Sequence, residues 1–416
     1  MKIAIVLWEA TIFGGTQRQA LELGLSLKRA GHEVGVFCYA YDPSRTYANV
    51  RNELPIYAVK EVQTALQSTV HTSSRAKKFI KKIGLYTVLL VGRQYLQSMQ
   101  NLFVAEKAVV ELARRMEQVH PLSYWDVINV HDYEAYKLAR MIKHPNIVWM
   151  LNDMQRTKKL VGPLLHRLYM GFIQKEMIKK EIRNIRSIAV MDYRNERLCK
   201  EKYGRDSSVV RSGIDLDMFD ILSSKRVPAQ SPYTLFASSI FFPHRRFEDL
   251  IDALALVVES GRRNFHLVLN GSPERAYEYY TFVKNRIESK DLSEFVTLVN
   301  GLSEEELKKQ YIASDIFIFP NNNQTWGLAI FEAMLAGCAC IVSRGSGGHE
   351  VLTDGENALL VDPESPEQIA EKLLFLMDHP HEIERISKSG NAFVTNNLSW
   401  DKYAQQMLRV FEEIQI

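Results

Sequence analysis

Residues 320–337, PNNNQTWGLAIFEAMLAG, place a polar loop directly before an amphipathic helix pattern. Gly327, Leu328 and Ala329 are expected to form the first turn of that helix, where free N–H groups and the helix dipole suit a phosphate or a sugar hydroxyl. Glu332 lies one turn deeper, among apolar residues. Because a carboxylate on an apolar face is costly unless it is paired, the sequence predicts a bound partner for Glu332.

Two adjacent arginines, Arg245 and Arg246, lie in the segment FASSIFFPHRRFEDLI. A planar guanidinium group can contact a phosphate with two parallel hydrogen bonds, so one or both arginines are candidate phosphate ligands. The alternative for Arg246 is that it begins a helix and pairs with Glu248 or Asp249 in solvent.

Gly14, Gly15 and Thr16 follow the first apolar run of the chain. Glycine lets a ligand approach the backbone closely, and a helix that begins near Thr16 would direct its N–H groups at that ligand. A Gly-Gly pair is common in ordinary turns, so its place after the first predicted strand is what favours a binding role.

Short apolar runs alternate with helical patterns in both halves of the chain, which predicts parallel sheets with helices on both faces. The runs are KIAIVLW, EVGVFCYA, DVINV, NIVWML, RSIAVM and SSVVRS, then YTLFASS, FHLVLNG, VTLVNG, DIFIFP, ACIVSRG and ALLVDP. The Ser- and Pro-containing stretch 223–233 between the two sets is typical of a linker. We therefore predict two Rossmann-like domains, residues 1–212 with a returning helix in 398–416, and residues 213–397, with ligands in the cleft between them.

The composition is that of a soluble protein, with 416 residues, 46% apolar and 24% charged, and the length suits two domains. No signal peptide or membrane-spanning run is visible in the sequence. Cys38, Cys199, Cys338 and Cys340 fit neither a disulfide framework nor a zinc site. A reducing, cytoplasmic location is therefore expected.

Charge is distributed unevenly, with a net +12 over residues 1–220 and a net −9 over the remainder. This asymmetry predicts different ligands for the two domains, but no motif for nucleic acid accompanies the basic half. In the segment 73–93 a cluster of lysines is interleaved with apolar residues: Lys77, Lys78, Lys81 and Lys82. Such a helix can lie peripherally on the anionic inner face of a membrane; the alternative is a solvated lysine face on an ordinary packed helix.

Four segments resemble glycosyltransferase family 4 when they are taken together and in order. They are FGGTQRQALELGLSLKRAGHEV, VHDYEAY, VVRSGIDLDMF and WGLAIFEAMLAGCACIVSRGSGGHEVLTDGENALLV. The resemblance covers nearly the whole chain and is strongest from about residue 210 to residue 365. It implies an α/β protein of the GT-B fold, in which two facing Rossmann-like domains with parallel sheets enclose a cleft. It also implies a retaining enzyme that uses a nucleotide sugar and needs neither a metal nor another cofactor.

The resemblance assigns Glu332 to the ribose hydroxyls of the nucleotide and Trp326 to the aromatic position before the helix. Gln324 stands where the family has a second glutamate. An amide keeps the hydrogen-bonding geometry but loses the negative charge, which leaves open a changed donor sugar or a loss of activity.

The same resemblance places Ser239 where the family has an arginine, and it aligns Arg245 with the lysine of the pyrophosphate clamp. His131 is expected to face the donor sugar. Backbone groups near Val299 and Asn300 are expected to meet the base, which does not distinguish UDP from GDP. Asp215 and Asp217 fall in a turn that connects the domains, so the resemblance argues against a metal site there.

The resemblance thus predicts transfer of a hexose-type sugar from UDP or GDP to a glycan or lipid-linked acceptor, in surface polysaccharide or glycoconjugate synthesis. Gln324 and Ser239 motivate an alternative, a nucleotide-sugar-binding subunit without activity. A GT-B epimerase is a further, weaker alternative, because the order of the motifs would then be coincidental.

Overall fold

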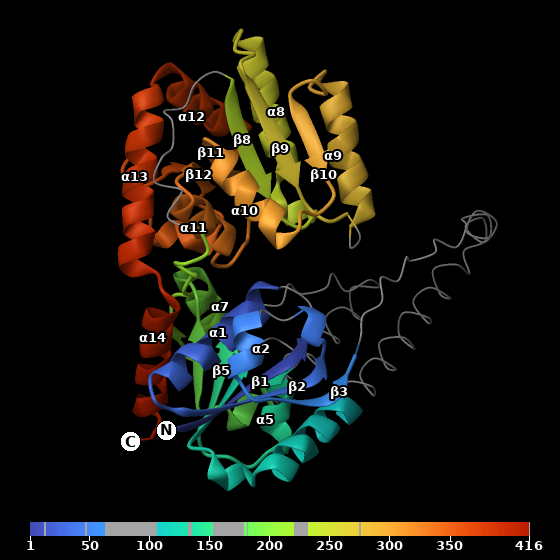
Figure 1. Cartoon of the computed structure of the whole chain (residues 1–416), viewed down its shortest axis with the longest axis vertical. Coiled ribbons are helices and arrows are strands. Elements are labelled where there is room, and N and C mark those ends of the chain that lie inside the picture. Colours follow the sequence, from blue (N-terminus) through green and yellow to red (C-terminus); the bar gives the residue numbers. More distant parts are fainter. Residues whose placement is uncertain are drawn as a thin grey trace, which may run out of the picture. The chain divides into compact units, whose positions relative to one another are not determined.

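The computed structural model describes most of the chain as two compact units (Figure 1). The N-terminal unit contains Met1–Val190, Asn195–Val210 and Ala404–Ile416, and the C-terminal unit contains Met191–Arg194 and Arg211–Tyr403. The residues described are 1–11, 14–45, 48–62, 106–131, 135–152, 179–180, 182–219, 232–273 and 276–415. The lysines proposed for membrane contact and most of the predicted linker lie outside these residues.

The N-terminal unit is built on a parallel sheet of seven strands in the order β3-β2-β1-β4-β5-β6-β7. Every residue of β4 and β5 is buried, as expected for central strands of a sheet covered on both faces. The strands are β1 (Lys2–Ala10), β2 (Glu33–Tyr41), β3 (Ile56–Glu61), β4 (Val127–His131), β5 (Ile147–Leu151), β6 (Ser187–Val190) and β7 (Ser208–Val209).

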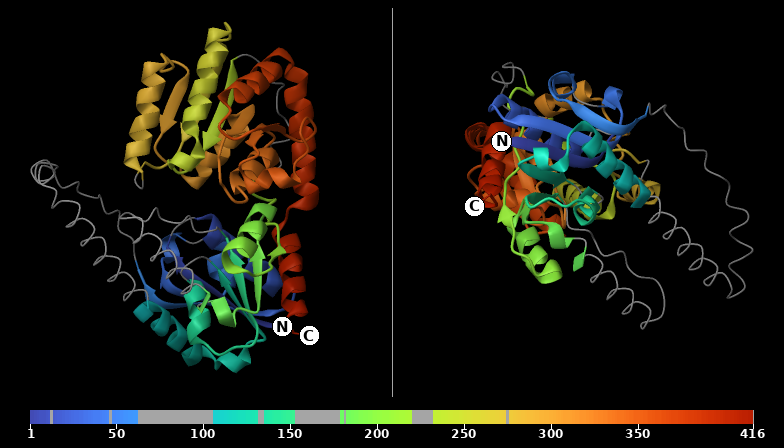
Figure 2. Two further views of the ribbon diagram at one scale, coloured as in Figure 1. Left: turned by 180° about the vertical axis from the view of Figure 1, so that it is seen from behind. Right: turned by 90° about the horizontal axis from the view of Figure 1, so that it is seen from below.

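Helix α1 (Gly15–Arg29) follows β1 and buries the predicted face of Ala20, Leu23 and Leu27 completely. Both ends of the chain lie in this unit and close to each other (Figures 1 and 2). The remaining helices before residue 210 and the last helix are α2 (Ala48–Glu53), a helix over 106–119, α5 (Leu138–Met141), α7 (Tyr193–Tyr203) and α14 (Trp400–Glu413). Short 3-10 turns are η1 (Pro43–Arg45), η2 (Leu122–Tyr124), η3 (Ala135–Lys137) and η4 (Ile182–Asn184).

The C-terminal unit has a parallel sheet of six strands in the order β10-β9-β8-β11-β12-β13. Helix α8 packs against α9 and α12 over one face, while α11 packs against α10 on the other and also contacts α13 (Figure 1). The strands are β8 (Tyr233–Ser238), β9 (Phe265–Asn270), β10 (Val296–Val299), β11 (Ile316–Phe319), β12 (Ala339–Ser343) and β13 (Leu359–Val361). The helices are α8 (Phe247–Glu259), α9 (Tyr277–Ser289), α10 (Glu304–Ala313), α11 (Leu328–Leu335), α12 (Pro366–Asp378) and α13 (Pro380–Asn397), with 3-10 turns η6 (Pro243–Arg245) and η7 (Gly347–Val351).

Each sheet has one point at which the strand order reverses, between β1 and β4 in the first and between β8 and β11 in the second. Loops leaving the carboxyl ends of strands at such a point diverge, and ligands of open α/β sheets bind there. In the N-terminal unit, this rule selects the loop that carries Gly14 and Gly15 and the end of β4 at His131. In the C-terminal unit, it selects the loops 239–246 and 320–327.

The predicted α/β class is confirmed, and each of the apolar runs predicted as strands contains or overlaps a strand. The sequence prediction missed β3, an edge strand whose residues are only partly buried or exposed. Its sequence, IYAVKE, has a short apolar run that ends in the exposed residues Lys60 and Glu61, as suits an edge strand. No helix among the described residues is long and apolar enough to cross a membrane.

Three aromatic side chains pack together at the reversal point of the C-terminal sheet. Phe236 of β8 and Phe317 of β11 pair in register, are fully buried, and have ring centroids 5.8 Å apart. The ring of Tyr311, from α10, lies 5.1 Å from the first and 5.6 Å from the second. The two strands whose loops diverge are therefore fixed by packing as well as by hydrogen bonds.

Replacing Phe317 with alanine should lower the free energy of unfolding by about 3–5 kcal/mol, because it leaves a cavity between these rings. Urea denaturation measures the change. Leu256→Ala, at a position 37% exposed on α8, is the control and should change the value by less than about 1 kcal/mol. Equal losses in the two variants would contradict this description of the cluster.

Candidate functional site

The two loops at the reversal point of the C-terminal sheet meet through Arg245 and Gln324. The Nη1 group of Arg245 donates a hydrogen bond to Oε1 of Gln324. In the amide orientation that satisfies both of its polar atoms, Asn321 accepts from Arg245 Nη1 at 3.0 Å and donates to the Arg245 carbonyl at 3.1 Å. The backbone N–H of Asn322 donates to the His244 carbonyl at 2.8 Å. Two residues predicted separately from the sequence are thus in direct contact.

The backbone of Gln324 is held from a third loop, which follows β12. Its N–H donates to the Gly345 carbonyl at 3.1 Å, and its carbonyl accepts from the Gly347 N–H at 2.9 Å. Because the side-chain partner of Arg245 at this position is a neutral amide, the contact leaves the guanidinium charge uncompensated by Gln324. A glutamate there would form an ion pair instead.

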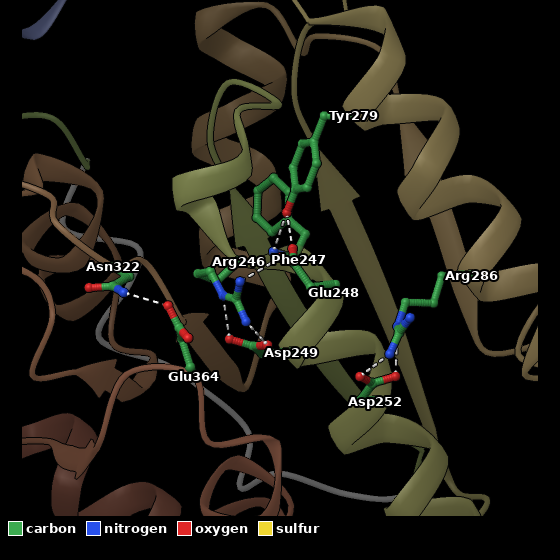
Figure 3. Close-up of polar contacts among 9 residues, drawn as sticks. All are labelled: Arg246, Phe247, Glu248, Asp249, Asp252, Tyr279, Arg286, Asn322 and Glu364. Atoms are coloured by element: carbon green, nitrogen blue, oxygen red, sulfur yellow. Dashed lines mark hydrogen bonds and ion pairs between the residues drawn. The ribbon is translucent and has the colours of Figure 1, made fainter. Parts of the chain in front are cut away.

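Arg246 faces a different environment. Its guanidinium donates to both carboxylate oxygens of Asp249, at 2.8 and 2.7 Å, and lies 3.0 Å from Glu248 (Figure 3). Hydrogen bonding to Asp249 raises the pKa of Arg246, while burial raises the pKa of Asp249. The structure therefore favours the alternative in which Arg246 begins a helix and pairs with its acidic residues.

Glu332 has a protein partner, which the sequence analysis did not identify. The hydroxyl of Tyr311 donates to Glu332 Oε2 at 3.2 Å. Tyr311 is 1% exposed, and burial together with the nearby carboxylate raises its pKa well above 10. It therefore remains a hydrogen-bond donor at neutral pH. A carboxylate can accept several hydrogen bonds, so this contact is compatible with a ligand at the same group.

The helix that carries Glu332 begins at Leu328, with Gly327 as its N-cap in the left-handed region at φ 81°. Its first N–H groups, including that of Ala329, have no acceptor within the helix. Trp326, just before it, is only 2% exposed and stacks on Phe331 with centroids 4.6 Å apart. Trp326 therefore packs the loop against α11 and does not form an exposed binding surface.

Two predicted positions, Ser239 after β8 and Val299 at the end of β10, both contact Gly271. Gly271 donates its N–H to the Val299 carbonyl at 3.0 Å, and a Cβ at residue 271 would lie 2.1 Å from the Ser239 carbonyl. Asn300, directly after Val299, is exposed. The loops after β8, β9 and β10 therefore pack together, and only a glycine fits between them.

Sequence reasoning missed a salt bridge that supports the Trp326 loop. Arg211 Nη2 lies 2.7 Å from Glu350 Oε2, with the two side chains 14% and 12% exposed. Both oxygens of Glu350 also accept from the N–H of Tyr193, at 3.1 and 3.0 Å. The Arg211 guanidinium lies 4.9 Å from the ring centroid of Tyr193 and 5.5 Å from that of Trp326.

In the N-terminal unit, the two loops selected by the strand order carry the predicted residues. Gly14 is the N-cap of α1, so Gly15 and Thr16 form its first turn. His131 is fully buried at the end of β4, and its Nε2 lies 2.8 Å from Oδ1 of Asn129. Burial lowers the pKa of His131 to about 3, so its imidazole is neutral at physiological pH.

Comparison with known proteins connects this geometry to an enzyme class. Residues 219–393 match the family described as Glycosyl transferases group 1. The matched segment begins in the C-terminal unit at Phe219 and lies within that unit.

Curated relatives align with about half of this chain or with nearly all of it. An uncharacterized glycosyltransferase of Methanocaldococcus jannaschii is 24% identical over 426 aligned positions, which cover 99% of this chain and 98% of the relative. A phosphatidyl-myo-inositol mannosyltransferase of Mycobacterium tuberculosis is 26% identical, over 51% of this chain and 56% of the relative. These findings support a glycosyltransferase of the group 1 type.

Solved structures show the fold of the complete chain. Sucrose-phosphate synthase from Thermosynechococcus elongatus covers 100% of this chain and 99% of its own, at 16% identity and a TM-score of 0.68. Anabaena HepE in complex with UDP and glucose covers 99% and 100%, at 14% identity and the same TM-score, 0.68. The predicted GT-B fold is confirmed.

Three further residues of the site, Asn321, Asn322 and Tyr311, were not predicted from the sequence, although a sequence signal exists for the first two. Asn321 and Asn322 belong to a run of polar residues directly after β11, a position that marks the binding edge of a parallel sheet. Tyr311 lies within α10, and no local pattern distinguishes it from a core tyrosine. Among the described residues, no group of three or more His, Cys, Asp and Glu side chains could hold a metal ion.

The buried neutral His131 predicts a specific pH dependence of stability. Its pKa is lowered in the folded state, so between about pH 6.5 and pH 3 the unfolded chain binds a proton that the folded chain does not. The free energy of unfolding should therefore fall by about 1.4 kcal/mol for each pH unit below 6.5.

His131→Gln should remove this contribution, so its loss of stability between pH 7 and pH 5 should be smaller than that of the wild type by about 2 kcal/mol. Urea denaturation at the two pH values measures it. His381→Gln, at an exposed side chain, is the control and should behave like the wild type. If His131→Gln keeps the pH dependence of the wild type, the histidine is not buried in its neutral form.

Proposed function

We propose that this chain is a retaining glycosyltransferase that moves a hexose-type sugar from UDP or GDP to a hydroxyl of a glycan or lipid-linked acceptor. The observation that carries the proposal is the contact of Arg245 with Gln324 at the reversal point of a group 1 domain. The binding of UDP and glucose by the structural neighbour from Anabaena supports a nucleotide-sugar donor. Surface polysaccharide or glycoconjugate synthesis at the cytoplasmic face of a membrane is the proposed setting.

Arg245 is the proposed ligand of the donor diphosphate. The partners described for it, Gln324 and Asn321, are neutral amides. They orient the guanidinium, whose planar fork can contact a phosphate through two parallel hydrogen bonds. The first N–H groups of α11, at Leu328 and Ala329, add a second set of donors for an anion. With these groups in place, we propose that the reaction requires no metal ion.

The proposed reaction is a front-face displacement. The bond between the anomeric carbon and the diphosphate oxygen breaks, the acceptor oxygen bonds to that carbon on the same face, and the leaving phosphate takes the acceptor proton. Arg245 stabilises the negative charge that grows on this phosphate. Gln324 positions the guanidinium, which is a physical reason for an amide where the family has a carboxylate.

Glu332 is the proposed ligand of the ribose hydroxyls. The Tyr311 hydroxyl holds one carboxylate oxygen from the side of the core, at 3.2 Å. This contact stabilises the ionised carboxylate and fixes its direction. Tyr311 thus has a positioning role that the sequence did not suggest.

Product formation distinguishes the enzyme from the alternative, a nucleotide-sugar-binding subunit. The purified protein should be screened against a panel of UDP- and GDP-sugars with hydroxyl-bearing acceptors, with and without EDTA. The proposal predicts nucleotide release that depends on the acceptor and survives EDTA. Tight donor binding with no release for any acceptor would instead favour the binding subunit.

Two variants of the Arg245 contact should both impair the reaction. Arg245→Ala should lower kcat, because it removes a charged hydrogen-bond donor to the leaving group. The activation free energy should rise by about 2–4 kcal/mol. Gln324→Glu should weaken donor binding by about 1–2 kcal/mol, because a carboxylate would pair with the arginine. Steady-state kinetics measures both. A higher kcat/KM in Gln324→Glu would show that the missing carboxylate limits catalysis and would contradict this account of Gln324.

Glu332→Ala should weaken donor binding by about 1.5–3 kcal/mol, because hydrogen bonds to a charged group are lost. Tyr311→Phe should weaken it less, by about 0.5–1.5 kcal/mol, because only the orienting hydrogen bond disappears. Calorimetric titration with UDP and with GDP measures both. Glu371→Ala, at a carboxylate 69% exposed on α12, is the control. Wild-type affinity in Glu332→Ala would rule out the ribose assignment.

A further inference from the structure

Arg246 joins the 3-10 turn η6 to helix α8 in an unusual backbone conformation. Its φ of 53° and ψ of 38° lie in the left-handed region. A residue with a side chain is strained there by about 1–2 kcal/mol, whereas glycine is unstrained and asparagine tolerates the region well. Because φ and ψ of Arg246 set the relative direction of the segments on either side of it, a change in its conformation would shift Arg245 relative to α8.

The Arg246 side chain is held in place by the first turn of the helix that follows. Asp249 accepts two of its N–H groups, and Glu248 lies 3.0 Å from a third (Figure 3). The Asp249 carboxylate is 6% exposed and the Arg246 side chain 25%. A bidentate, largely buried pair of this kind restrains both partners. Two carboxylates compensate the positive charge of Arg246, which makes this guanidinium a poor ligand for a further anion.

At the N-terminus of α8, a backbone N–H group already has a protein acceptor. The N–H of Phe247 donates to the Tyr279 hydroxyl oxygen at 2.8 Å, and that hydroxyl donates to the Glu248 carboxylate (Figure 3). Helix N-termini bind anions through N–H groups that lack protein acceptors. Here a tyrosine supplies the acceptor and the first turn is acidic, so this end of α8 is not suited to a phosphate.

A separate hydrogen bond joins the residue before Arg245 to the loop that carries Gln324. Asn322 donates its side-chain N–H to Glu364 at 2.8 Å and its backbone N–H to the His244 carbonyl at 2.8 Å. His244 and Arg246 flank Arg245 on either side. The residue before Arg245 is thus tied to the opposite loop, and the residue after it is tied to α8.

We propose that Arg246 is a positioning residue whose pairing with Asp249 stabilises the left-handed turn that presents Arg245 to Gln324. This inference rests on the proposed function, because it assigns the contact with the donor phosphate to Arg245 and excludes Arg246 from that contact. Of the two alternatives that the sequence left open for Arg246, it selects the pairing with the acidic residues of the helix.

Four substitutions separate the backbone of Arg246 from its side chain. Arg246→Gly and Arg246→Asn remove the guanidinium but accept the left-handed turn, whereas Arg246→Ala and Arg246→Val remove it and strain the turn. Arg286→Ala is the matched control, because Arg286 also pairs with a carboxylate of α8, Asp252, but one turn further along (Figure 3). The double variant Arg246→Gly, Asp249→Asn removes both partners of the pair. It replaces Arg246→Gly in the comparison if the unpaired Asp249 carboxylate destabilises the single variant.

Two measurements are made on each full-length variant. Calorimetry gives the dissociation constants of UDP and GDP, and hydrogen–deuterium exchange of residues 239–249 without ligand reports the turn itself. We expect Gly and Asn variants within threefold of the wild-type dissociation constant, and Ala and Val variants weaker by tenfold or more. Exchange should be faster in the Ala and Val variants than in the Asn variant, and Arg286→Ala should match the wild type in both measurements.

An equal loss of nucleotide binding in all four variants would overturn the proposal, because it would show that the donor touches the guanidinium. Equal exchange in Asn, Ala and Val variants would also overturn it, because the turn would then not depend on this residue. If the wild type binds neither nucleotide, the proposed function fails. The exchange measurement still decides whether Arg246 controls the turn.

Discussion

The hydrogen bond from Arg245 to Gln324 joins two loops that the topology of the C-terminal sheet would otherwise let diverge. Strands β8 and β11 are neighbours, but the chain leaves them toward opposite faces, to α8 and to α11. Ligands of open parallel sheets bind where this happens. Packing of Phe236 and Phe317 below fixes the two strands, and the Arg245 contact above fixes their loops. The other candidate residues of the C-terminal unit lie on loops and helices that adjoin this point.

Two adjacent arginines differ in the charge of the partners described for them. The partners described for Arg245 are amides, whereas Arg246 is paired with Asp249 and Glu248. The first arrangement orients a positive charge and the second compensates one. This difference explains why two identical side chains, one residue apart, are assigned different tasks. In the proposed function, Gln324 orients Arg245 as a neutral amide, whereas a glutamate at this position would form an ion pair with it.

The fold was predictable from the sequence because buried parallel strands are marked by continuous apolar runs, and only the partly exposed edge strand β3 escaped. The loops of the site were predictable because polar residues that directly follow such strands lie at one edge of the sheet. Contacts between distant segments were not predictable. The Tyr311 hydroxyl on Glu332 and the pairing of Arg211 with Glu350 join residues 21 and 139 positions apart, and no local pattern encodes them. The left-handed backbone conformation of Arg246 was also not predictable, because arginine is not a residue type that favours it.

The central claim is that a nucleoside diphosphate binds at the reversal point of the C-terminal sheet. A crystal structure of the protein with UDP or GDP tests it most directly. The account predicts a phosphate oxygen within hydrogen-bonding distance of the Arg245 guanidinium, the ribose hydroxyls on Glu332, and Arg246 still paired with Asp249. A nucleotide bound elsewhere, or a phosphate held by Arg246 with Arg245 turned away, would contradict it.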